Sequence, residues 1–267
     1  MNYRLIAADL DGTILNNEGL LSDYTRKTVK EYQRLGGMFT IATGRMDESA
    51  RRFADELEVQ IPVVTYNGGK VVELESGRTL SEAFLDNDAA IKTYNALREI
   101  NKDMVVYFNG LPFAAEINDV ILKYKKRIKF DINLICDVEE VITPYTKKIL
   151  VIDPKREFDL MESITAEIFG DRVNCVISDK EYFEILPTGV SKGGGLKTIA
   201  DSLNIPLSEV MAIGDHINDI SMIKAAGLGV AVQNAEPQVI AAADYVTLSN
   251  EEDGVAYMIK KVINNNI

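Results

Sequence analysis

The chain has 267 residues, of which 46% are hydrophobic and 26% charged. This composition is typical of a folded globular protein and excludes a disordered or fibrous chain. The 29 basic and 41 acidic residues give a formal net charge of −12, which repels nucleic acid backbones and anionic lipids, so we expect neither partner. Its two cysteines, Cys136 and Cys175, have no CxxC spacing. They exclude a zinc cluster or a disulfide framework, and we expect a cytoplasmic protein.

Strands and helices alternate at the start of the chain. Apolar runs and amphipathic stretches predict strands at Leu5–Ala8, Met38–Ala42 and Val63–Thr65, and helices at Tyr24–Leu35 and Glu48–Leu57. This alternation is typical of βαβ units and a parallel sheet. The next segment breaks the pattern, since Lys70–Glu75 and Arg78–Glu82 flank a Ser-Gly pair and predict a hairpin.

The middle of the chain has a different, α+β pattern. We expect helices at Asp88–Asn101, Asp119–Lys126 and Phe158–Phe169, and strands at Met104–Phe108, Phe113–Glu116, Ile149–Ile152, Val173–Ser178 and Tyr182–Leu186. The βα pattern then resumes with helices at Lys192–Leu203, Asn218–Ala226, Pro237–Ala242 and Val255–Ile263, and strands at Val210–Ile213 and Gly229–Val232. The predicted fold class is α/β: a Rossmann-like parallel sheet domain of residues 1–84 and 187–267, interrupted by an α+β unit over 85–186.

Two carboxylates follow the first predicted strand directly. Asp9 and Asp11 are two residues apart, and on an extended chain this spacing sends both side chains to one side. Ligands of open α/β sheets bind at the carboxyl ends of the strands. Because adjacent carboxylates repel unless a cation or a shared proton relieves them, the pair predicts a ligand site. A solvated strand end with an Asx turn is the alternative.

Two further segments offer groups that bind anions. Thr43, Gly44 and Arg45 follow the second strand, where they either cap a helix and form a surface ion pair or bind phosphate. Lys192 opens a glycine-rich helix, so its ammonium group lies at a positive helix end, with a flexible linker as the alternative. This segment is not a P-loop, because Gly195 stands where a lysine is required.

A second acidic segment follows the strand predicted at Val210–Ile213. Asp215 and Asp219 are four residues apart and would share one face of a helix. Acids at a helix start also stabilise the helix dipole, which is the alternative. His216 is the only histidine, so it cannot build a histidine-based metal site; we expect it in a local hydrogen bond or at a substrate rim.

Taken together, these segments place carboxylates, a hydroxyl group and a lysine at strand ends or helix starts. Hard oxygen ligands without histidine or cysteine select Mg²⁺, which keeps several waters and binds substrate phosphates. The sequence therefore predicts a Mg²⁺ site at the edge of the sheet.

These motifs resemble those of the haloacid dehalogenase (HAD) superfamily, and within it the Cof-type phosphatases with an inserted cap of class IIB. The four motifs occur in the order of the family, at Asp9-x-Asp11, Thr43, Lys192 and Gly214–Asp219. The match spans the whole core, and Asn67 lies in a segment that resembles the family's element before the hairpin. One departure is His216, where relatives more often carry a small or amide residue.

The resemblance implies a Mg²⁺-dependent phosphatase that hydrolyses small phosphorylated metabolites through an aspartyl-phosphate. Asp9 would be the nucleophile, and Asp11 the general acid and base. Mg²⁺ would be bound by the carboxylates of Asp9 and Asp215 and by the backbone carbonyl of Asp11. Asp219 would not bind the ion directly but would orient its waters and Lys192. The expected phosphate-binding residues are Thr43, Gly44, Lys192 and Asn218, and those expected at the substrate rim are Arg45, Asn67, Lys148 and His216.

The inserted unit, residues 85–186, is implied to be a cap that selects the substrate. We expect a monomer or a weak homo-oligomer. A phosphomutase, which returns the phosphoryl group to a sugar, stays open as an alternative, and its product would be an isomeric sugar phosphate instead of free phosphate. A non-catalytic regulatory or binding module on the same fold is a second alternative, although it would not need all of the acids and the lysine.

Overall fold

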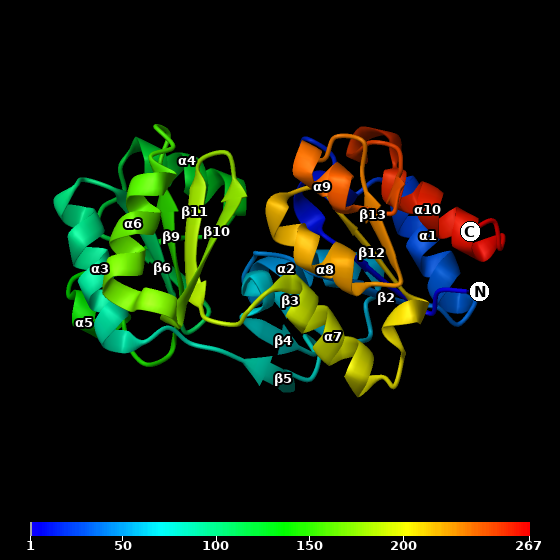
Figure 1. The fold of residues 1–267 in the computed structure, drawn as a ribbon, viewed down its shortest axis with the longest axis horizontal. Helices are drawn as coiled ribbons and strands as arrows, with labels where there is room; N and C mark the ends of the chain where they lie inside the picture. Colours follow the sequence, from blue (N-terminus) through cyan, green and yellow to red (C-terminus); the bar gives the residue numbers. More distant parts are fainter. Residues whose placement is uncertain (1) are drawn as a thin grey trace. The chain divides into compact units, whose positions relative to one another are not determined.

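The computed structural model describes residues 2–267, apart from the side chain of residue 171. The chain divides into two compact units, one formed by Met1–Glu82 and Ser191–Ile267 and the other by Ala83–Val190 (Figure 1). The junctions expected after residues 84 and 186 lie two residues later and four residues earlier than these limits. No helix in the described chain is both long and apolar enough to cross a membrane.

The first unit is built on a parallel sheet. Its strand order is β14-β13-β12-β1-β2, and the bounds are β1 Leu5–Ala8, β2 Met38–Ile41, β12 Val210–Gly214, β13 Leu228–Ala231 and β14 Tyr245–Val246. Leu5 of β1 lies opposite both Val210 and Met38. The carboxyl ends of β1, β2 and β12 therefore meet at one edge of the sheet, and the predicted α/β fold class is confirmed.

Helices cover both faces of this sheet (Figure 1). They are α1 Asp23–Arg34, α2 Asp47–Leu57, α7 Lys192–Ser202, α8 Ile220–Ala225, α9 Pro237–Ala242 and α10 Gly254–Ile263. Ile6 and Ala8 of β1 pack in the apolar cluster that includes residues of α1, α2 and α10. Leu5 and Ala7 pack in the cluster that includes residues of α7 and α8. Burial on both faces explains why the strand is apolar throughout, without the alternation of a half-exposed strand.

A small antiparallel sheet continues the first unit beyond β2. It consists of β3 Val63–Thr65, β4 Lys70–Val72 and β5 Thr79–Glu82. Pairing of β4 with β5 confirms the predicted hairpin, although β4 ends three residues earlier than expected. A parallel bridge between Ala42 and Val64 joins this sheet to the main one, so the segment after β3 lies beside the carboxyl end of β2.

The second unit is a six-stranded sheet with helices. The strand order is β10-β11-β9-β6-β7-β8, with β6 Asp103–Phe108, β7 Leu111–Ala114, β8 Asn133–Leu134, β9 Thr146–Ile152, β10 Val173–Asp179 and β11 Tyr182–Pro187. Its helices are α3 Asn87–Glu99, α4 Asp119–Ile128, α5 Val138–Val141 and α6 Phe158–Phe169. All strand pairs are antiparallel except β7 with β8. The short elements β8, α5 and β14 were not predicted.

Helix α7 begins with glycines because it packs closely on its neighbour. A Cβ atom at Gly193 would lie 2.3 Å from the backbone oxygen of Ser221 in α8. Gly194 points outward, and its nearest neighbour would be Ser191 Oγ at 3.3 Å. Glycine lowers helix propensity by about 1 kcal/mol relative to alanine, so Gly193 is explained by space and not by helix formation.

We predict that Gly193→Ala lowers the free energy of unfolding by about 1–3 kcal/mol, because the methyl group must displace the backbone of α8. Gly194→Ala is the matched control in the same turn and should change that free energy by less than about 0.5 kcal/mol, since gained helix propensity offsets the contact with Ser191. Urea unfolding followed by circular dichroism measures both. Equal losses in the two variants would contradict the packing explanation.

Candidate active site

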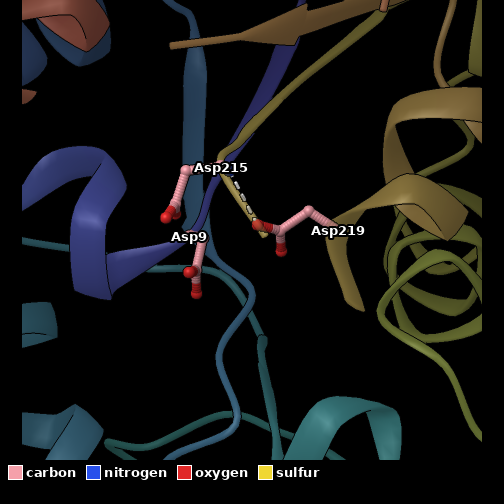
Figure 2. Close-up of side chains that lie close together, drawn as sticks. All are labelled: Asp9, Asp215 and Asp219. Carbon is pink, nitrogen blue, oxygen red and sulfur yellow. Dashed lines mark hydrogen bonds between the residues drawn. The ribbon is translucent and has the colours of Figure 1, made fainter. Parts of the chain in front are cut away.

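Three carboxylates converge at the edge of the parallel sheet (Figure 2). Asp9 follows β1, Asp215 follows β12, and Asp219 ends the helical turn Ile217–Asp219. One carboxylate oxygen of each lies within 4.8 Å of the others. Asp9 and Asp219 are 5% and 0% exposed. Acids from the first and fourth motifs, more than two hundred residues apart in the sequence, thus form one buried cluster.

Lys192 supplies the positive charge inside this cluster. It is the first residue of α7 and is 1% exposed. Its Nζ lies 2.8 Å from Asp9 Oδ1 and 2.6 Å from Asp219 Oδ1. Burial alone would lower the pKa of Lys192, but the carboxylates of Asp219 and Asp9 outweigh it and raise the pKa above its usual range. The ammonium group therefore stays charged between two acids.

One lysine does not compensate three clustered acids, of which Asp9 and Asp219 are buried and Asp215 is half-buried. Burial raises the pKa of Asp9 well above its usual range; Lys192 opposes this shift, and Asp219 and Asp215 add to it. Burial also raises the pKa of Asp215 to about 7, with Asp219 adding and a hydrogen bond from Thr13 opposing. The donor set consists of hard oxygens with a surplus of negative charge, so these residues fit a divalent cation such as Mg²⁺.

Asp219 is held in place through both of its oxygens. Oδ1 pairs with Lys192, and Oδ2 accepts hydrogen bonds from the backbone N–H groups of Asp215 at 2.9 Å and His216 at 3.0 Å (Figure 2). Gly214 allows this approach, since a Cβ atom there would lie 2.4 Å from that of Asp219. Asp219 thus orients the start of α8 and the lysine, whereas Asp215 uses only Oδ1, which accepts from Thr13 Oγ1 at 2.6 Å.

The side chain of Asp11 lies with Arg45 and not with the three acids. Arg45 donates from Nε to Asp11 Oδ2 at 2.7 Å and from Nη2 to Asp11 Oδ1 at 2.6 Å. Its guanidinium also lies 5.0 Å from the centre of the Phe53 ring. Arg45 thus engages both oxygens of the Asp11 carboxylate in a bidentate pair. The role of the Asp11 backbone carbonyl at a metal stays a prediction.

The second motif lies beside the fourth. Thr43 is 1% exposed, and its Oγ1 accepts a hydrogen bond from the backbone N–H of Arg45 at 3.2 Å. Asn67 is 2% exposed, and its Oδ1 accepts from Asn218 Nδ2 at 2.9 Å. Gly44 packs on this amide, since a Cβ atom there would lie 2.9 Å from Asn67 Nδ2. The first unit therefore brings the phosphate-binding candidates of three motifs to one edge.

Lys148 belongs to β9 of the second unit. It is 3% exposed, forms an ion pair with Glu184 at 3.0 Å, and lies 4.8 Å from the centre of the Tyr107 ring. Its role at a substrate stays a prediction. Thr13 was not expected in the site; only its place in the first motif, four residues after Asp9, could have indicated its bond to Asp215.

Comparison with known proteins identifies the family to which this chain belongs. A model of the haloacid dehalogenase-like hydrolases matches residues 6–259, and the chain belongs to this family. Phosphatase YwpJ of Bacillus subtilis (strain 168) is 29% identical over 288 residues, covering 97% of this chain and 100% of that one. The 5-amino-6-(5-phospho-D-ribitylamino)uracil phosphatase YcsE of the same strain is 30% identical over 261 residues, covering 97% and 96%.

A solved structure shows the same fold. The crystal structure of a haloacid dehalogenase-like hydrolase from Bacteroides thetaiotaomicron has a TM-score of 0.89 and is 31% identical, covering 97% of this chain and 99% of that one. The predicted resemblance is therefore confirmed. The chain is a phosphoric monoester hydrolase of the Cof type.

We predict that Asp215→Asn raises the melting temperature of the metal-free protein by about 2–4 °C, because it removes one of three converging charges. An amide oxygen still accepts the hydrogen bond from Thr13. Mg²⁺ should stabilise the wild type but not this variant, since a ligand stabilises only the protein that binds it. Thermal unfolding with EDTA and with added Mg²⁺ measures both effects. Asp201→Asn, at an exposed position, is the control, and full Mg²⁺ stabilisation of Asp215→Asn would contradict the assignment.

Proposed function

We propose that this phosphatase depends on Mg²⁺ and hydrolyses small phosphorylated metabolites through an aspartyl-phosphate on Asp9. The observation that carries the proposal is the setting of Asp9: a buried carboxylate at the carboxyl end of a central strand, 2.8 Å from the Lys192 ammonium group and beside two further acids. A carboxylate can attack phosphorus without first losing a proton to a base once nearby cations keep it ionised.

The reaction divides into two displacements. In the first, an oxygen of Asp9 forms a bond to phosphorus, and the bond from phosphorus to the ester oxygen breaks. Asp11 gives its proton to the leaving alcohol. In the second, water attacks phosphorus and gives a proton to Asp11, and the bond to Asp9 breaks to release inorganic phosphate. Because Arg45 engages both oxygens of Asp11, Asp11 must leave this pair and take up a proton from solvent before it can act as the acid.

Negative charge on the phosphoryl oxygens grows in both transition states. In this proposal Lys192 and the Thr43 hydroxyl group stabilise that charge, and such preorganised stabilisation is usually the largest single contribution to catalysis. They also explain how a protein with a net charge of −12 binds an anionic ester, since local cations dominate the field at the site.

The Asp9 and Asp215 carboxylates and the Asp11 carbonyl would hold Mg²⁺, with Asp219 and Asn218 supporting them. When bound, this ion neutralises the acids and the phosphoryl group of the ester. The surplus of acid over base in the cluster supports this assignment.

The relatives and the division of the chain support a proposal for the substrate class. YcsE is named for a phosphate ester of a ribityl compound, and we propose sugar phosphates or similar polyol phosphates as substrates of this chain. All four motifs lie outside the unit Ala83–Val190. We propose that this second unit is a cap that selects the ester, while the first unit performs the chemistry.

We predict that Asp9→Asn lowers phosphate release by at least about 10⁴-fold while the protein stays folded, since the amide keeps the shape but not the nucleophile. Asp11→Asn should slow esters with poor leaving groups most, because only these need a proton on departure. The test measures phosphate release from sugar phosphates and p-nitrophenyl phosphate, with Mg²⁺ and with EDTA. Near-normal kcat in Asp9→Asn would exclude covalent catalysis by this residue, and an isomeric sugar phosphate as product would indicate a mutase.

We predict that exchanging Ala83–Val190 for the matching unit of a relative with another ester preference transfers the ranking of kcat/KM among esters. The Mg²⁺ requirement should stay, because every proposed metal ligand belongs to the first unit. A folded chimera that keeps the original ranking would place specificity in the first unit, for example at Arg45 or His216.

A further inference from the structure

The turn after β3 has an unusual backbone. Tyr66, Asn67 and Gly68 all have positive φ angles, of 50°, 55° and 99°. Glycine adopts this region freely and asparagine with some cost, but for tyrosine it is unfavourable. Strained conformations persist only where the surrounding structure fixes them, and they cluster at functional sites. The turn is therefore held by contacts elsewhere in the first unit.

Two of these contacts reach the second motif. The backbone N–H of Tyr66 donates to the carbonyl oxygen of Arg45 at 3.0 Å, and that of Asn67 donates to the carbonyl oxygen of Thr43 at 3.0 Å. A contact with the third motif comes from Gly68, where a Cβ atom would lie 2.1 Å from the carbonyl oxygen of Ser191. The turn thus joins the loop after β2 to the start of α7.

The side chain of Asn67 adds a link to the fourth motif. It is 2% exposed, and its Oδ1 accepts a hydrogen bond from Asn218 Nδ2 at 2.9 Å. The Oδ1 atom of Asn218 is buried and has no hydrogen-bond partner among the described residues. An amide has a donor end and an acceptor end. The bond to Asn67 uses one of the two N–H donors of Asn218 and leaves its acceptor oxygen open.

An open acceptor decides what Asn218 can bind. Its oxygen cannot form a hydrogen bond to an ionised phosphoryl oxygen, which is also an acceptor. It can accept from a water molecule or contact a cation. Asn218 lies one residue before Asp219 and three after Asp215 in the sequence, in the same motif as these acids. The phosphate-binding role expected for Asn218 stays a prediction, since the second N–H of its amide can still donate to a phosphoryl oxygen.

We propose that Asn67 is a positioning residue for the cation site. It fixes the amide of Asn218 so that the carbonyl oxygen is available to Mg²⁺ or its water, and its turn ties this orientation to Thr43 and Lys192. The inference rests on the Mg²⁺ site of the proposed function. Groups that orient metal ligands typically change metal affinity by about 10–100-fold when they are removed.

The test measures Mg²⁺ affinity of the full-length protein without substrate, from the dependence of the melting temperature on Mg²⁺ concentration. Asn67→Gly tolerates the positive φ and removes only the amide, whereas Asn67→Ala adds backbone strain. Both should weaken Mg²⁺ binding by at least about 10-fold. Asn204→Ala is the matched control, since Asn204 has a φ of 54° in the same unit and is exposed, and it should leave the affinity unchanged.

One further measurement separates positioning from loss of structure. Adding Asn218→Ala to Asn67→Gly should cause no additional loss of Mg²⁺ affinity, because Asn67 acts through Asn218. Wild-type affinity in Asn67→Gly or additive losses in the double variant would each overturn the inference while leaving the proposed function standing. A wild-type protein that does not respond to Mg²⁺ would refute the metal site itself and, with it, the role of Asn67.

Discussion

The buried ammonium group of Lys192 is the contact on which the site depends. It pairs with two of the three clustered acids, Asp9 after β1 and Asp219 before α8. A charge buried without a partner costs several kcal/mol. The first residue of α7 is therefore tied to two strand ends at once, and the catalytic geometry cannot change without exposing or orphaning a charge.

The acids can converge because the backbone at two glycines passes close to their side chains. A Cβ atom at Gly12, whose φ is 78°, would lie 2.4 Å from Asp215 Oδ2, and one at Gly214 would meet Asp219 at the same distance. Glycine is thus required on both sides of the acid pair. The glycines of the HAD-type motifs act here as spacers that let carboxylates from different strands converge, and not as flexible hinges.

The sequence predicted the parts of this site that follow from topology. Parallel strands bring their carboxyl ends to one edge, so convergence of Asp9 and Asp215 could be expected from strand ends alone. The sequence could not predict that Arg45 pairs with Asp11 or that Asn67 pairs with Asn218. The two residues of each pair are 34 and 151 positions apart, and their contact depends on side-chain rotamers. The elements β8, α5 and β14 have only two to four residues, too few to show a period.

Several features of the first unit that lower its stability lie at the same edge of the sheet. Three acids share one buried lysine, a tyrosine has a left-handed backbone, and α7 begins with glycines that weaken the helix. Each feature lowers stability by itself, and such departures from local preference are expected where function requires them. The rest of the sheet compensates with strands that are apolar on both faces. A rigid, well-packed sheet can hold acids in a repulsive arrangement until a cation arrives, and this stored repulsion favours binding of the cation.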